Sequence, residues 1–305
     1  MLIVEIIRHP SDAERQKLIE FVGRLTGEMG ARPLSDHLWL DLNGGDGDGF
    51  IAVTVADAEG ILGVAQISAT NDSSSLELAL HPTLPARRQL HDDLFETAVD
   101  AFRHGPGDRL FWWVDDPDDH DDALADRLGF APERELYEMD RTLPLGQSAA
   151  IATRSFVPGQ DDAAWITVNN RAFADHGEQG GWTPDMLALR LAEPWFDADG
   201  FRLHERDGRL AGFCWTKLHA DRQPVTGEIY VIAVDPDFHG QGLGKQLTIA
   251  GLDSITDRGV SNAMLYVDAD NTPAVALYEG LGFAVHRRRR AFSADLRPTT
   301  SRGAS

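Results

Sequence analysis

Residues 234–245 read VDPDFHGQGLGK, and this stretch decides the fold. The residues from Glu228 to Val234 predict a strand, and those from about Gly242 to Asp257 predict a helix. Glycines in such a turn let successive backbone N–H groups point toward one position, where the helix dipole adds partial positive charge. The stretch therefore predicts a pyrophosphate site, with a plain tight turn as the alternative. It lacks both the G-x-G-x-x-G spacing and the GK[ST] ending, which excludes a Rossmann loop and a Walker loop.

The charge balance limits the possible ligands. The 305 residues include 28 basic and 49 acidic side chains, a net charge of −21, which opposes binding to nucleic acid or to an anionic membrane. An anionic ligand therefore needs a local positive site, which a backbone cradle at a helix start can provide. No apolar stretch approaches the roughly 20 residues that span a bilayer, and the opening MLIVEIIRHP does not have the pattern of a signal peptide. We expect a cytoplasmic protein with no membrane partner.

A second motif, N-x-x-A-x-x-LYE-x-LGF, occupies residues 271–283. Together the two motifs resemble the GNAT superfamily of acyl-coenzyme A N-acyltransferases. The first motif matches the superfamily's pyrophosphate loop, Q/R-x-x-G-x-G/A, except that His239 stands at the Gln/Arg position. This departure affects one side-chain contact and leaves the backbone cradle intact. The resemblance implies a mixed α/β (α+β) sheet fold with acetyl-CoA as co-substrate and no metal.

The chain contains a distant internal repeat. LFWWVD at 110–115 leads to LGF at 128–130, and MLYVD at 264–268 leads to LGF at 281–283. The offset is about half the chain, so the repeat predicts two copies of one domain. We place the domains at 1–140 and 153–305, with a linker at 141–152 that contains Pro144, Gly146 and Ser148.

Local signals place other elements of the second domain. Thr183 followed by Pro184 predicts the start of a helix, because threonine caps well and proline fits the first helical position. Asp207-Gly208 predicts the turn of a hairpin between strands at 201–206 and 210–217. The single cysteine, Cys214, lies inside the second of these strands, where we expect a buried structural thiol.

Four further segments resemble the mycothiol synthase family, whose members carry two GNAT domains in tandem. They are GEQGGWT (177–183), GFCWTK (212–217), GEIYVIAVDP (227–236) and MLYVDADN (264–271). The resemblance implies acetyl-CoA-dependent acetylation of the cysteinyl amine of cysteinyl-glucosaminyl-inositol, the last step of mycothiol biosynthesis. The first half matches poorly, since its loop reads HPTLPARRQL at 81–90 with no glycine. We therefore expect one working acyl-CoA site, in the second domain, and a structural or substrate-clamping role for the first.

The resemblance assigns the catalytic groups. Glu228 would be the general base that acts through water on the substrate ammonium, and Tyr278 the general acid toward the departing thiolate. The alternatives are an exposed strand carboxylate for Glu228 and a core aromatic for Tyr278, at helical spacing from Ala274 and Leu281. In the superfamily the backbone N–H near Val234 binds the thioester oxygen.

Two sets of binding residues also follow from the resemblance. Acyl-CoA would contact the strand end, the loop and the start of the last helix, namely Ile232, Ala233, Val234, His239, Gly240, Gln241, Gly242, Leu243, Gly244, Lys245, Asn271, Thr272, Pro273, Ala274, Val275 and Ala276. The acceptor would contact groups suited to an ammonium and a polyol, namely Asp36, Glu178, Lys217, Glu228 and Tyr266. The alternative for Asp36 is a helix cap or a solvated loop residue, and for Lys217 a surface lysine.

Two charged clusters favour structural roles. The acidic run at 115–122 lacks the glycine and the final glutamate of an EF-hand loop, so we expect a solvated helix entrance rather than a metal site. The four arginines at 287–290 are expected to form ion pairs or to lie near the phosphates of the cofactor.

Two rival functions remain open. One is a tandem GNAT enzyme that acts on another small amine, such as an aminoglycoside, or on a protein N-terminus. The other is a non-catalytic acyl-CoA sensor, which would lack the base and the acid, whereas Glu228 and Tyr278 are both present. We expect a monomer whose partners are acetyl-CoA and a small thiol-amine.

Overall fold

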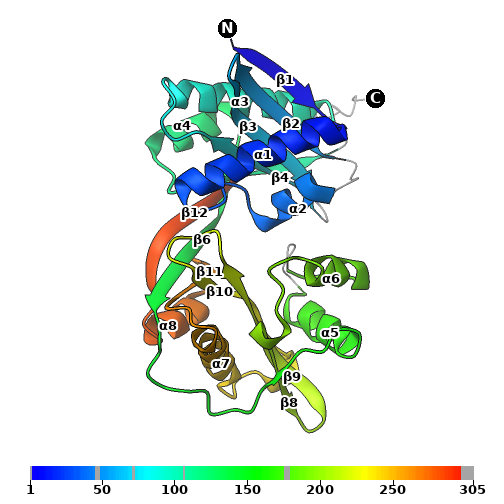
Figure 1. Ribbon diagram of the computed structural model, residues 1–305, viewed down its shortest axis with the longest axis vertical. Coiled ribbons are helices and arrows are strands. Elements are labelled where there is room, and N and C mark those ends of the chain that lie inside the picture. The colour runs from blue at the N-terminus through cyan, green and yellow to red at the C-terminus, as the bar shows by residue number, and fades with distance from the viewer. Residues whose placement is uncertain (1, 45–48, 71–72, 106, 175–178, 297–305) are drawn as a thin grey trace, which may run out of the picture. The chain divides into compact units, whose positions relative to one another are not determined.

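The structure, a computed structural model, describes residues 2–44, 49–70, 73–105, 107–174 and 179–296. The chain forms two compact units (Figure 1). Unit 1 comprises residues 1–135 and 289–305, and unit 2 comprises residues 136–288. No helix in the described ranges is long and apolar enough to cross a membrane.

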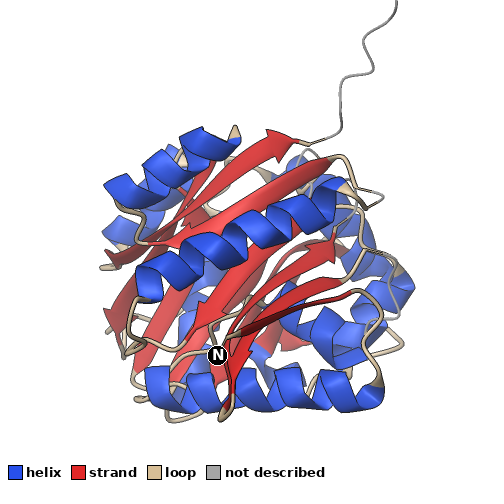
Figure 2. Cartoon of the chain, turned by 90° about the horizontal axis from the view of Figure 1, so that it is seen from above, coloured by secondary structure: helices blue, strands red, loops and turns tan. Residues whose placement is uncertain are grey.

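Unit 1 is a sheet with helices on both faces. Its strands lie in the order β1-β2-β3-β4-β5-β12. Its elements are β1 (Ile3–Ile7), α1 (Asp12–Met29), α2 (Asp36–Gly44), β2 (Ile51–Asp57), β3 (Gly60–Ala69), β4 (Ser74–Leu80), α3 (Arg87–Arg103), β5 (Arg109–Asp115), α4 (Asp119–Leu128) and part of β12 (Ala284–Asp295). Alternate strand residues face the two sides, so α1 and α2 bury one core around Phe21, and α3 and α4 bury another around Phe95. Figure 2 shows the strands lying between layers of helices.

Unit 2 has a similar layout. Its strands lie in the order β6-β11-β10-β9-β8-β7. Its elements are part of β6 (Ala131–Thr142), β7 (Arg154–Ser155), α5 (Asp162–Ala172), α6 (Pro184–Leu191), the 3₁₀ helix η1 (Ala198–Gly200), β8 (Phe201–Arg206), β9 (Arg209–His219), β10 (Thr226–Val234), the 3₁₀ helix η2 (Pro236–Phe238), α7 (Leu243–Asp257), β11 (Asn262–Asp268) and α8 (Thr272–Gly280). Helices α7 and α8 cover one face, and α5 and α6 cover the other (Figure 1).

Several local predictions are confirmed. The hydroxyl of Thr183 accepts a hydrogen bond from the backbone N–H of Met186, 3.2 Å away, at the start of α6. Asp207 and Gly208 have φ angles of 52° and 72° in the turn between β8 and β9. Cys214 is fully buried, and burial raises the pKa of its thiol to about 12, as expected for a structural cysteine rather than a nucleophile.

The division into units differs from the contiguous domains expected from the repeat. Residues 136–142 of β6 pair with β11 in unit 2, whereas residues 289–295 of β12 pair with β5 in unit 1. The boundary therefore lies at Glu135 and Leu136, and the segment 289–296 returns to unit 1. A repeat in the sequence shows which strands correspond, but it does not show which sheet each strand enters.

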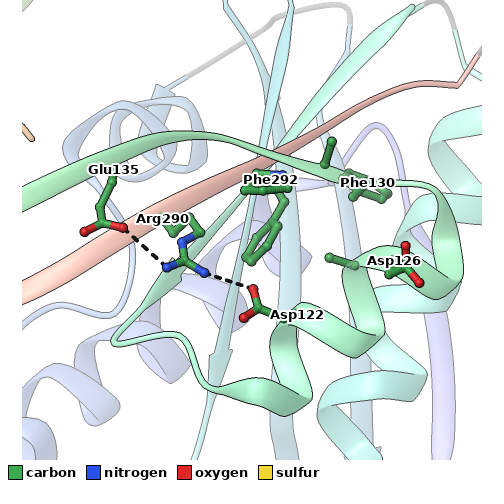
Figure 3. A pocket seen from close by; sticks show the side chains of 9 residues that line it. Asp122, Asp126, Phe130, Glu135, Arg290 and Phe292 are labelled. Atoms are coloured by element: carbon green, nitrogen blue, oxygen red, sulfur yellow. Dashed lines mark hydrogen bonds and ion pairs between the residues drawn. The ribbon is translucent and has the colours of Figure 1, made fainter. Parts of the chain in front are cut away.

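The acidic run and two of the four arginines, Arg289 and Arg290, form ion pairs in unit 1. The carboxylate of Asp118 accepts hydrogen bonds from the backbone N–H groups of His120 and Asp121, which makes the run the entrance of α4, as predicted. Figure 3 shows Arg290 between Asp122 and Glu135, at 2.9 and 3.3 Å. These three residues line a pocket of about 640 Å³ whose apolar wall includes Phe130 and Phe292. The expectation that arginines in this run are ion-paired is confirmed for Arg290 and for Arg289, which lies 2.9 Å from Glu77.

Candidate active site

Two neighbouring strands of unit 2 diverge at the centre of the candidate site. β10 and β11 are parallel and pair over Gly227–Ile229 with Ala263–Leu265. The register of β10 against β9 shifts between Ile229 and Val231, which marks a bulge at Tyr230. Beyond it, β10 continues to Val234 along β9 alone, while β11 continues to Asp268 along β6. Over residues 232–234 the edge of β10 that faces away from β9 therefore has no strand partner among the described residues.

The glycine-rich loop follows the end of β10. Gly240 and Gly242 have φ angles of 75° and 74°, a left-handed conformation that glycine adopts without strain. Gly242 is the N-cap residue of α7 and has no side chain to cap the helix, so the first N–H groups of α7 point into the loop. A Cβ atom added at either glycine would meet open space, which places both residues at an exposed surface. This geometry suits an anion, and the pyrophosphate site itself stays a prediction.

Hydrogen bonds to side chains hold the loop in place. The buried Asp235 receives a hydrogen bond from Arg171, 2.7 Å away, and Asp237 receives hydrogen bonds from Arg171 and Arg209 at 3.0 and 2.7 Å. The hydrogen bonds from Arg209 and Arg171 lower the pKa of Asp237. His239 donates from Nε2 to the carbonyl oxygen of Val234 at 3.0 Å, so the residue at the variant position of the motif closes the loop on itself. Gln241 pairs with Arg206.

One face of the sheet gathers charged side chains around Glu228. Lys217 on β9 and Glu228 on β10 are cross-strand partners, so their side chains lie on the same face, and His219 shares that face two residues further along β9. Glu228 is 7% exposed, and its Oε2 lies 2.7 Å from Nε2 of His219. The alternative of an exposed strand carboxylate for Glu228 is therefore wrong. Sequence reasoning missed His219, whose only signal is its two-residue spacing from Lys217.

A second polar group on this face involves Tyr266. Tyr266 on β11 is the register partner of Glu138 on β6, and its hydroxyl donates to Oε2 of Glu138 at 3.1 Å. Arg222, in the turn between β9 and β10, donates to Oε1 of Glu138 at 2.8 Å. Burial by itself raises the pKa of Glu138, but the hydrogen bond and the charge of Arg222 outweigh it, and the pKa lies below its usual value. The sequence placed Glu138 inside the first domain, expected at 1–140, and Tyr266 in the second. Their contact was therefore not predicted.

Lys217 is buried rather than exposed. The residue is 4% exposed, and its Nζ lies 4.9 Å from the ring centre of Trp195 and 5.7 Å from that of Tyr230. Aromatic faces attract a cation, which lowers the cost of burying the ammonium. The same side of the sheet continues into an aromatic core under α5 that includes Trp165 and Trp215. The reading of Lys217 as a surface lysine is therefore wrong.

Tyr278 lies on the other side of the sheet. It sits on α8, is 8% exposed, and packs edge-on against Phe283 at 6.0 Å in the core under α7 and α8. Burial raises the pKa of its phenol, so Tyr278 stays protonated in neutral solution. The side chain of Asn271 caps α8 by accepting from the N–H of Ala274 at 3.2 Å, and residues 272–276 form the first turns of this helix. The structure thus places Tyr278 and Glu228 on opposite faces of the sheet.

Two further residues were predicted to bind the acceptor. Asp36 is the first residue of α2 in unit 1, where its carboxylate pairs with Arg32. Glu178 falls outside the described residues.

Unit 1 contains a related loop without glycines. β4 and β5 are parallel and pair over three residues, Ser74–Leu76 with Leu110–Trp112, as β10 and β11 do. Ala86, the N-cap residue of α3, has a φ angle of 54° and makes no side-chain cap, so it reproduces the left-handed turn of Gly242. A missing glycine therefore does not by itself change the backbone here.

Comparison with known proteins places this architecture in a family. The model of the acetyltransferase (GNAT) family matches residues 167–283, which include β9, β10, the loop, β11 and α8. A GCN5-related N-acetyltransferase from Sphaerobacter thermophilus has a similar fold, with a TM-score of 0.70 at 22% identity over 97% of this chain and 96% of that one. A tandem GNAT protein from the clavulanic acid biosynthesis pathway gives 0.69 at 16% identity over 98% and 100%. The fold and the site define a GNAT acyltransferase, an enzyme that uses acyl-CoA and an acceptor, and the predicted mixed α/β fold with tandem GNAT domains is confirmed.

Relatives that align with most of the chain identify the family within this class. The mycothiol acetyltransferase of Acidothermus cellulolyticus is 41% identical over 290 residues, covering 88% of this chain and 87% of the relative. That of Salinispora arenicola is 45% identical over 275 residues, covering 86% and 88%. The chain belongs to the mycothiol acetyltransferase family.

Proposed function

We propose that this enzyme transfers the acetyl group of acetyl-CoA to the cysteinyl amine of cysteinyl-glucosaminyl-inositol, the last step of mycothiol biosynthesis. The observation that carries the proposal is the buried carboxylate of Glu228 beside the divergence of β10 and β11. A base such as this carboxylate must remove a proton from the ammonium before the amine can attack, and the thioester must lie beside the amine. The family membership supports the choice of substrate.

Acetyl-CoA would bind at the start of α7 and along the edge of β10 that faces away from β9. The pyrophosphate would accept hydrogen bonds from the N–H groups of residues 239–245, and the exposed Lys245 would add a positive charge at the same place. The pantetheine arm carries amide groups that can pair with the backbone of Ile232, Ala233 and Val234. Residues 271–276, at the start of α8, would line the other side of the acyl-CoA.

The chemistry requires one base and one proton donor. Glu228 would take a proton from the ammonium, directly or through water, and the amine would then attack the thioester carbonyl. The N–H near Val234 would stabilise the negative oxygen that develops there. The C–N bond forms as the C–S bond breaks, one proton reaches the thiolate and one is released. Because its pKa is raised, Tyr278 would serve as a hydrogen-bond donor to the thiolate.

The polar face would hold the acceptor. Lys217 and Tyr266 supply hydrogen bonds for a polyol, and Glu228 supplies the negative charge for the ammonium. We propose that Asp36 and Glu178 also contact the acceptor, as the family resemblance implies. We further propose that the enzyme works as a cytoplasmic monomer, where reducing conditions agree with its single buried thiol.

The decisive experiment incubates the protein with acetyl-CoA and cysteinyl-glucosaminyl-inositol. We expect a product heavier by one acetyl group whose thiol still titrates fully, because the amine is the acceptor. Mass spectrometry and a thiol titration measure both properties. Turnover no faster than that of free cysteine would refute the substrate assignment, and screening a set of small amines would then identify the acceptor of this acetyltransferase.

A further inference from the structure

The carboxylate of Glu228 has a specific partner in the structure, and it is a histidine. Nε2 of His219 lies 2.7 Å from Oε2 of Glu228, and the side chains are 15% and 9% exposed. Two atoms that both carry lone pairs repel at this distance, so a proton lies between them. With the ring neutral, Nε2 carries the hydrogen and donates it to the carboxylate.

We propose that His219 is a positioning residue for Glu228, which it holds by one oxygen so that the other faces the acceptor amine. This inference rests on the proposed function, in which Glu228 is the base. Among the described residues, His219 is the one that hydrogen-bonds the carboxylate of Glu228, and it engages Oε2. Oε1 therefore remains as the acceptor for the amine or for a water molecule. A carboxylate that rotates freely would spend less time in the geometry that proton transfer requires.

The second ring nitrogen lies near another carboxylate. Nδ1 of His219 lies 3.8 Å from Oδ1 of Asp221, whose side chain is 39% exposed. The ring therefore stands between two carboxylates, that of Asp221 near water and that of Glu228 in the buried site. Contacts at both nitrogens orient the ring, so that Nε2 points at Glu228.

Charged side chains on the neighbouring elements surround Glu228 and His219. Lys217 stands opposite Glu228 on β9, and Arg222, in the turn between β9 and β10, interacts electrostatically with Glu228. Glu138 on β6 is held by Arg222 and by Tyr266 on β11. Among the described residues, the ring of His219 is the group that hydrogen-bonds the carboxylate of Glu228, so it supplies the orientation.

Three variants test the proposal. His219→Gln keeps an N–H donor at a similar position, and His219→Leu removes the donor. His120→Gln is a matched control, because Nε2 of His120 lies 2.9 Å from Asp92 in unit 1, outside the candidate site. For each protein, kcat and kcat/KM are measured from pH 5.5 to 9.5, and circular dichroism checks folding. The ionisation of the amine is common to all variants, so differences between the profiles report on the enzyme.

We expect His219→Leu to lower kcat by on the order of 10- to 100-fold at every pH, with KM for acetyl-CoA unchanged. His219→Gln should stay within about threefold of wild type, because its amide N–H can replace the donor that His219→Leu removes. His120→Gln should follow the wild-type profile. A loss in His219→Gln as large as that in His219→Leu, or full activity in His219→Leu, would overturn the proposal.

A double-mutant cycle separates this inference from the proposed function. If His219 acts through Glu228, His219→Leu should cost little further activity in a Glu228→Gln background. Equal losses in both backgrounds would show that His219 does not act through Glu228. If Glu228→Gln alone retains wild-type activity, the assignment of the base fails first. If another amine proves to be the better acceptor, the same cycle is measured with that amine.

Discussion

Replacing Glu138 with glutamine removes a buried charge that Arg222 and Tyr266 share. Glu138 is 3% exposed and the side chain of Arg222 is 22% exposed, with 2.8 Å between the paired atoms. Removing one partner of a fully buried ion pair costs roughly 3–5 kcal/mol, because the other charge stays behind. Since Arg222 reaches water, we expect Glu138→Gln to lower the free energy of unfolding by about 2–3 kcal/mol at pH 7.

The effect should depend on pH with a definite sign. The folded pKa of Glu138 lies below the ordinary value of 4.5, so the ion pair stabilises the protein above that pH and stops doing so as the pH falls through the folded pKa. Urea unfolding of wild type and Glu138→Gln should therefore differ by a constant amount from pH 7 to about pH 5.5, and the difference should shrink below about pH 4.5.

A matched exposed pair is the control for this experiment. The paired atoms of Asp100 and Arg103 are 2.9 Å apart, but the side chains are 70% and 39% exposed, so Asp100→Asn should cost less than about 1 kcal/mol. A Glu138→Gln protein within about 0.5 kcal/mol of wild type at pH 7, or a difference that grows on acidification, would refute the reasoning about the buried pair.

Three further substitutions test the proposed site. Glu228→Gln should slow acetylation by on the order of 10²–10⁴-fold while acetyl-CoA still binds, and near-normal turnover from pH 6 to 9 would exclude Glu228 as the base. Tyr278→Phe should reduce kcat less and leave the pH profile unchanged up to about pH 9, because the buried phenol does not ionise in that range; a changed alkaline limb would contradict this. Calorimetry should find one tight acetyl-CoA site per chain, and Gly242→Glu, which places a bulky anion at a φ of 74°, should abolish it. Two tight sites would show that the turn at Ala86 also holds a pyrophosphate.

The local features were within reach of the sequence because each depends on a few neighbouring residues. The loop at 239–245, the cap at Thr183, the turn at Asp207-Gly208 and the entrance of α4 all follow from short-range backbone preferences. The ion pairs of the arginine run followed from the excess of acidic residues. The environment of a side chain depends on burial, which is why the sequence left a surface lysine open as the alternative for Lys217, whereas the residue lies against Trp195 and Tyr230.

By itself, the sequence determined the superfamily, the tandem repeat and the glycine-rich turn between β10 and α7, since these reside in contiguous motifs and in their spacing. Only the tertiary structure decided which residues meet. The register of β9 against β10 sets Lys217 opposite Glu228 and brings His219 to the same carboxylate, and a slip of one residue would turn them to the other face. The pairing of β6 with β11 brings Glu138 to Tyr266, and the pairing of β12 with β5 returns the end of the chain to unit 1. Such contacts join residues as far apart in the chain as Arg109 and Asp295, and hydrogen bonding between strands, rather than local preference, selects them.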